Sequence, residues 1–148
     1  MRWTTITSDH LKSLGHGSIV DRARAIAVGA LDPVSEAIAD ATARVRRAVS
    51  TGNVLDADPT TVPDSLKLVA IRLSLFALME RIGLPLSEDQ RQTRRDDISD
   101  LNRITDNRTK VELPDNPDSS AEMQATGHAI EALNVHNRQT RRKDLNGL

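Results

Sequence analysis

The 148-residue sequence contains no cysteine and no tyrosine, and it has one Phe (Phe76) and one Trp (Trp3). Without thiols the chain can form neither disulfides nor thiolate metal sites, so nothing points to an oxidising compartment. Proteins that bind single-stranded nucleic acid stack the bases on several aromatic side chains, and pockets for sugars or cofactors are commonly lined by them. The shortage of aromatics argues against both kinds of site.

A long apolar run and a charge excess are also missing. The longest apolar stretch, 68–79, contains Arg72 and is too short to span a bilayer. The segment 1–10 lacks the basic region and apolar run of a secretory signal. The net charge is −1, whereas dedicated DNA binders usually carry a strong basic excess. We therefore expect a soluble protein that is made in a reducing cytoplasm and does not enter a membrane.

Arginine is abundant: 16 of the 20 basic residues are Arg. Arg suits bidentate ion pairs at interfaces better than Lys does, but GC-rich codon usage would give the same bias, and both explanations stay open. Apolar residues make up 38% of the chain and charged residues 28%. This composition predicts a thin core that leaves much surface for water or for partners.

Three long helices are expected, which places the chain in the mainly α class as a small helical bundle. Asp32 and Pro33 form a typical helix start, and Gly52 ends that helix. A second helix, at about 63–82, is apolar on most sides and should be the central element. Ser87 and Gln90 form a capping box at the start of a third helix through Asp106. The expected core consists of Val34, Ile38, Ala41, Val45, Leu66, Val69, Leu73, Phe76, Ile98, Leu101 and Ile104.

The first half of the third helix has no apolar stripe, so we expect it to project beyond the core and contact a neighbouring subunit. The candidate interface residues are Arg91, Arg94, Arg95, Asp96 and Asp97. The adjacent carboxylates point about 100° apart on a helix and are expected to be solvated ion-pair partners.

The alternating segment 109–113 predicts one short strand. A helical domain would thus cover 1–113, followed by a linker and C-terminal tail at 114–148 with a weak helix and a basic end. The tail is interpreted either as a disordered end or as an arm that folds onto an acidic partner surface. The residues of this arm would be Arg138, Arg141, Arg142, Lys143, Leu145 and Leu148.

No constellation for catalysis is present. The four histidines, at 10, 16, 128 and 136, form neither an H-E-x-x-H motif nor a pair four residues apart, and no G-x-S-x-G motif occurs. We expect no catalytic residue, no cofactor and no metal. The cluster of Arg44, Arg46 and Arg47 is interpreted as a subunit contact, with a plain solvated surface or contact with DNA phosphates as alternatives.

The order of elements resembles a known family. The segments P-V-S-E-A-I-A-D-A-T-A-R-V-R-R-A-V (33–49), V-P-D-S-L-K-L-V-A-I-R-L-S-L-F-A-L-M (62–79) and I-S-D-L-N-R-I-T-D-N-R-T-K-V-E-L (98–113) are similar to the head–tail connector, or adaptor, proteins of tailed bacteriophages, including those of Mu-like prophages. The likeness covers residues 31 to 113. Asn107 or Arg108 stands where the family usually has Gly, and the family's Tyr-rich segment after the first core helix is absent.

This resemblance implies a non-enzymatic virion protein at the neck, on the capsid portal vertex. Such proteins form a ring, typically of twelve copies, that docks on the portal protein and extends the DNA channel. Double-stranded DNA passes without sequence specificity, and the ring offers a platform to the next neck, stopper or tail protein. The C-terminal segments of the family commonly reach the portal, which would suit the basic tail.

The alternative is a helical DNA-binding module, such as a small packaging subunit or a regulator. The turn at 83–86 joins two helices, as a helix–turn–helix would require. However, Pro85 and the acidic pair Glu88 and Asp89 make a poor reader of the major groove.

Overall fold

Helices dominate the fold, which confirms the predicted mainly α class. A computed structural model describes residues 2–29 and 31–118. The elements in chain order are β1 (Trp3–Thr5), α1 (Ser8–Leu11), the kinked turn η1 (Lys12–His16), α2 (Gly17–Ile26), α3 (Pro33–Ser50), β2 (Thr61–Pro63), the 3-10 turn η2 (Asp64–Leu66), α4 (Lys67–Arg81) and α5 (Glu88–Thr105).

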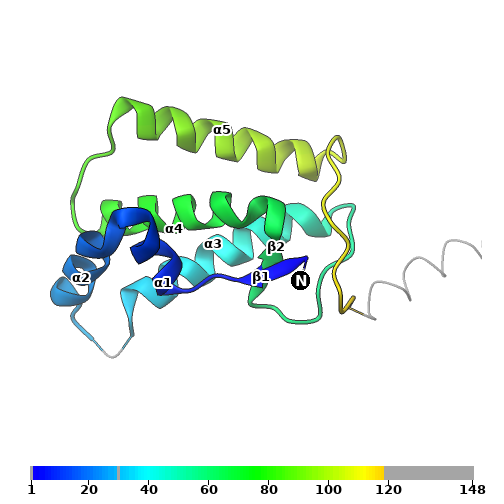
Figure 1. Cartoon of the computed structure of the whole chain (residues 1–148). Helices are drawn as coiled ribbons and strands as arrows, with labels where there is room; N and C mark the ends of the chain where they lie inside the picture. Colours follow the sequence, from blue (N-terminus) through cyan, green and yellow to red (C-terminus); the bar gives the residue numbers. More distant parts are fainter. Residues whose placement is uncertain (1, 30, 119–148) are drawn as a thin grey trace, which may run out of the picture. The chain divides into compact units, whose positions relative to one another are not determined.

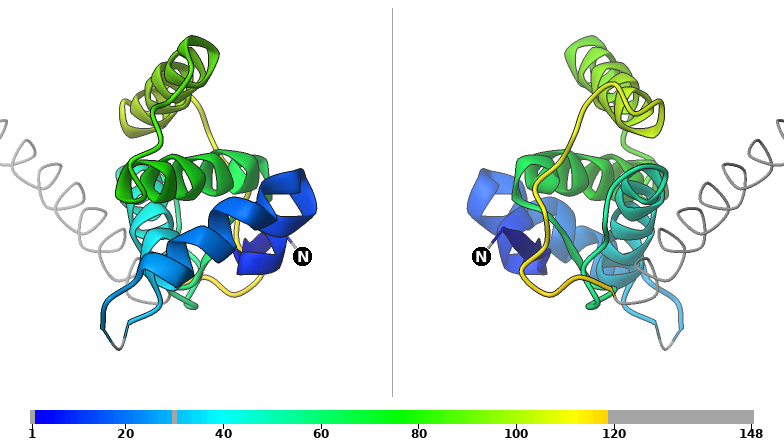
Figure 2. Two further views of the ribbon diagram at one scale, coloured as in Figure 1. Left: turned by 90° about the vertical axis from the view of Figure 1, so that its left-hand side faces the viewer. Right: turned by 90° about the vertical axis from the view of Figure 1, so that its right-hand side faces the viewer.

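Helix α4 is the centre of the fold, as its apolar sequence predicts. It lies between α5 on one side and the helices α1 to α3 on the other (Figures 1 and 2). A helix that is apolar on most sides has to be covered on most sides. Its buried apolar side chains are Val69, Ala70, Ile71, Leu73, Leu75, Phe76, Leu78 and Met79.

The predicted helix starts are confirmed for α3 and α5. The Asp32 carboxylate accepts a hydrogen bond from the Val34 amide, and Ser87 and Gln90 form the capping box of α5. Among the predicted core residues, Ile38 and Ile98 are only half-buried. The others are buried: Val34, Ala41, Val45, Leu66, Val69, Leu73, Phe76, Leu101 and Ile104.

The central helix begins later than predicted, because 63–66 belong to other elements. Residues 61–63 form β2, which pairs antiparallel with β1 in the register Trp3 with Pro63 and Thr5 with Thr61. The turn η2 then leads into α4 at Lys67. Strands of three residues carry too little alternation to be recognised in a sequence, so this sheet was missed.

The strand predicted at 109–113 is wrong: within 110–114 the backbone forms neither strand nor helix. This segment is held instead by single hydrogen bonds from side chains. The Trp3 indole Nε1 donates to the Glu112 carbonyl at 3.0 Å, and the Val111 amide donates to the Asn53 side-chain oxygen at 3.4 Å. Side chains can satisfy single backbone amides and carbonyls in this way without a neighbouring strand.

Residues 114–117, expected to be linker, are packed onto the loop before β2. Pro114 is buried, Asp56 and Pro117 form an isolated bridge, and the Ala57 amide donates to the Asn116 carbonyl at 2.9 Å. The compact unit therefore extends through Pro117. The predicted weak helix and basic end of the tail lie outside the described residues.

Arg46 fixes the loop between α3 and β2. Its guanidinium donates to the backbone carbonyls of Asp56 at 2.7 Å, Asp58 at 2.9 Å and Thr61 at 3.0 Å. The same group lies over the Trp3 ring, 5.6 Å from its centroid, in cation–π geometry. Arg46 thus has a structural role within the chain, which its place in an Arg cluster did not indicate.

Replacing Arg46 by Lys should lower the free energy of unfolding by about 1–3 kcal/mol, because one ammonium cannot satisfy three carbonyls and also cover the ring. Urea denaturation followed by circular dichroism measures this change. Arg47→Lys is the matched control, since Arg47 is exposed on the same helix. Equal losses in the two variants would contradict the role of Arg46.

Candidate interaction surface

An exposed apolar cluster lies where α2 gives way to α3. The exposed fractions of its side chains are 53% for Ile26, 102% for Val28 and 71% for Leu31. We call these three side chains the knob. Single exposed apolar residues are common, but several together on one surface feature are typical of interaction sites.

An ion pair closes the base of the segment that bears the knob. Arg24, in the last turn of α2, donates two hydrogen bonds of 3.1 Å to the carboxylate of Asp32 at the start of α3. The same carboxylate accepts from the Ser35 hydroxyl at 2.8 Å. The hydrogen bonds from Arg24 lower the pKa of Asp32 to about 2 and raise the pKa of Arg24. The two ends of the segment are therefore held together while the knob faces solvent.

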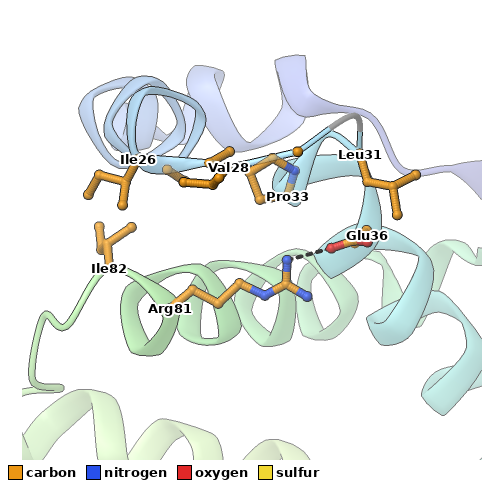
Figure 3. Close-up of a pocket in the computed structure, with 10 residues that line it drawn as sticks. Ile26, Val28, Leu31, Pro33, Glu36, Arg81 and Ile82 are labelled. Atoms are coloured by element: carbon orange, nitrogen blue, oxygen red, sulfur yellow. Dashed lines mark hydrogen bonds and ion pairs between the residues drawn. The ribbon is translucent and has the colours of Figure 1, made fainter.

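The three knob side chains also line a shallow cavity of about 350 Å³ against the end of α4. Figure 3 shows Ile26 and Ile82 facing each other from α2 and the end of α4. The charged part of the cavity wall is the ion pair between Arg81 and Glu36, with 2.7 Å between nitrogen and oxygen. A mostly apolar lining with one fixed ion pair suits a protein surface better than a reaction centre.

Asp32→Asn should lower the free energy of unfolding at pH 7 by less than about 1 kcal/mol, because the pair is partly exposed and Asn still caps a helix. The folded pKa of about 2 is below the ordinary value of 3.8. The charged carboxylate therefore stabilises the fold above about pH 4, and this contribution is lost as the pH falls towards 2.

Denaturation at pH 7, 4 and 2 compares the two proteins, and the difference between them should shrink over that range. Asp40→Asn, at an exposed position of the same helix, is the control. A difference in the free energy of unfolding that stays constant with pH would contradict the stabilising role of the ion pair between Arg24 and Asp32.

Helix α5 does not project beyond the core in its first half, so that prediction is wrong. Arg94 forms an ion pair with Glu80 of α4, and the amide of Gln90 lies 3.9 Å from the sulfur of Met79. Polar contacts attach this half to α4, and a search for an apolar stripe cannot find them.

Asp97 is 2% exposed, which contradicts its predicted role as a solvated ion-pair partner and removes it from the surface available to another subunit. Both its oxygens accept hydrogen bonds from Arg72 of α4, one at 2.9 Å. The sequence did hold a signal, since Arg72 interrupts an apolar helix and a cation in that setting needs an acidic partner.

Asp97→Ala should lower the free energy of unfolding by about 1.5–3 kcal/mol, because the half-buried guanidinium of Arg72 loses its charged hydrogen-bond partner. The neighbouring Asp96 is exposed, and Asp96→Ala should change it by no more than about 0.5 kcal/mol. Thermal and urea denaturation of both variants tests this. The interpretation fails if Asp97→Ala is as stable as Asp96→Ala.

The other residues of the predicted subunit interface lie on the exposed side of α5. Arg91 and Arg95 form ion pairs with Glu88, at 3.3 and 3.1 Å, and Asp96 accepts from the Gln92 side chain at 2.8 Å. These contacts are within one helix, so the charged surface remains open to a partner.

Arg44 and Arg47 line a groove of about 240 Å³ between α3 and α5. Apolar Ala48, Ile98 and Leu101 also line this groove. None of its lining residues belongs to the knob. The portal-arm candidates Arg138, Arg141, Arg142, Lys143, Leu145 and Leu148 lie outside the described residues.

The knob itself was missed at the sequence level. The signal was the run A-I-A-V-G-A-L (25–31) directly before a clear helix start. Helical spacing of apolar residues cannot show that Ile26, Val28 and Leu31 are exposed in the folded protein.

Within residues 2–29 and 31–118, no group of three or more His, Cys, Asp or Glu side chains is placed to hold a metal ion. None of the helices described there combines the length and hydropathy needed to cross a membrane. No family model, curated protein or solved structure matches the chain.

Proposed function

We propose that this protein is a structural assembly protein without enzymatic activity, and that it acts as a head–tail adaptor in the neck of a tailed bacteriophage. Its copies form a ring, typically of twelve, that docks on the portal protein at the capsid vertex. The ring extends the DNA channel and offers a platform to the next neck, stopper or tail protein.

The observation that carries this proposal is the knob. Burying a Val, Leu or Ile side chain contributes about 1.5–3 kcal/mol each, so exposing Ile26, Val28 and Leu31 forgoes several such contributions in the free chain. The ion pair of Arg24 with Asp32 joins the two ends of the segment that bears these side chains. A protein that works by binding other proteins makes use of such a surface, since contact with a partner covers it.

Two further features support the adaptor. The order of α3, α4 and α5 follows the segments in which the sequence resembles the connector family. The exposed charges of α5 at Arg91, Arg95 and Asp96 suit contacts between ring subunits, which are polar at their rims.

The test is the sedimenting mass of the protein, alone and mixed with the portal protein encoded beside it. We expect a multiple-copy complex with the portal. Loss of the complex on deleting 138–148 would identify the basic tail as the portal-binding arm, and survival would assign portal binding to the helical unit. Absence of the complex, together with tight and strongly salt-dependent binding of duplex DNA, would replace the adaptor by the helical DNA-binding module.

A further inference from the structure

A second groove, of about 480 Å³, lies on another part of the molecule from the knob. It is formed by the junction of β1 and α1, by one face of α3, and by the loop before β2. The lining residues are Thr5, Ile6, Thr7, Ser8, Ser35, Ile38, Ala39, Thr42, Ala43, Pro59 and Thr60. None of them is charged. We call this the receiving groove.

The receiving groove matches the knob in charge and in chemistry. The knob is borne by residues 26–29 and 31, which carry no charged side chain. Uncharged surfaces meet without the desolvation penalty of buried ions. Ile6, Ile38 and Pro59 offer apolar contacts to the knob, and the hydroxyls of Thr5 and Ser8 can donate to the carbonyls of an entering backbone.

The groove also has room for the knob. A cavity of about 150 Å³ accepts a benzene-sized group, so 480 Å³ accommodates the side chains of Val28 and Leu31 together. The knob side chains and the residues that line the receiving groove are different sets. No residue belongs to both surfaces, which a contact between unlike surfaces of two copies requires.

We propose that the knob of one copy inserts into the receiving groove of the next, so that the copies associate head to tail. This contact deepens the proposed function, because a ring rests on such a contact between unlike surfaces. A loop-to-loop contact would instead be isologous and would stop at a dimer. The contact thus supplies the subunit interface that the buried Asp97 does not.

The absence of cysteine allows a test without background. Val28→Cys and Ala39→Cys place thiols on the knob and on the exposed wall of the receiving groove. The two single variants, one carrying an affinity tag, are mixed and oxidised with copper–phenanthroline. We expect a disulfide-linked heterodimer on a non-reducing gel, and a ladder from the double variant. Thiols held in contact react at an effective concentration of order mM, so at ~10 μM chain the initial rate should exceed that of an unpaired control roughly 100-fold.

Ser50→Cys replaces Ala39→Cys in the matched control, since Ser50 is exposed at the far end of the same helix. Equal heterodimer yields with Ser50→Cys and Ala39→Cys would overturn the proposal. A dominant Val28→Cys homodimer would overturn it too, because it would mean that the knob meets its own copy.

A second measurement uses no cross-link. Val28→Asp and Ala39→Asp each place a charge in the contact and should abolish self-association in sedimentation. Their mixture should restore pairs and nothing larger, since one intact knob then meets one intact groove. Failure of the mixture to form pairs would contradict the contact. If the protein binds the portal but shows neither the specific cross-link nor the recovery of pairs, the adaptor function is kept and the knob–groove contact is rejected. If portal binding is absent as well, both proposals are rejected.

Discussion

The apolar circumference of α4 is the constraint from which the rest of the fold follows. This 15-residue helix buries side chains on most of its circumference, so little of its surface faces water. It needs neighbours on opposite sides, and α5 covers its share with polar contacts in its first half and with the buried Leu101 and Ile104 in its second half. Arg72 is the one cation turned from that apolar helix into the interface, and Asp97 must therefore be buried with it.

Much of this architecture was predictable from local signals. The helix starts at Asp32 and Ser87, the central position of α4 and most core positions depend on neighbours within one helical turn, which a sequence displays directly. What escaped prediction depends on partners far apart in the chain. Trp3 meets Glu112, Arg46 meets the loop before β2, and Arg72 meets Asp97. A cluster of arginines looks uniform in a sequence, although Arg46 is committed to backbone carbonyls and Arg47 remains exposed.

The knob was hidden from sequence analysis for a related reason. Exposure is a property of the tertiary structure, and an apolar residue before a helix start reads as a weak helix turn. Only the arrangement of α2, α3 and the end of α4 shows that Val28 and Leu31 have no cover within the described unit. The ion pair beneath them holds the segment's two ends together.

The two ends of the compact unit are fastened to each other, and this has a consequence for how the protein is made. The Arg2 amide donates to the carboxylate of Asp115, and the buried Trp3 reaches the carbonyl of Glu112. A ribosome releases the residues of β1 first, yet their partners emerge more than a hundred positions later. The N-terminal strand therefore has to wait, unpaired on that side, until almost the whole unit has been synthesised. This closure therefore comes late in the synthesis of the unit, and a nascent chain stalled before residue 112 would leave Trp3 without that hydrogen bond.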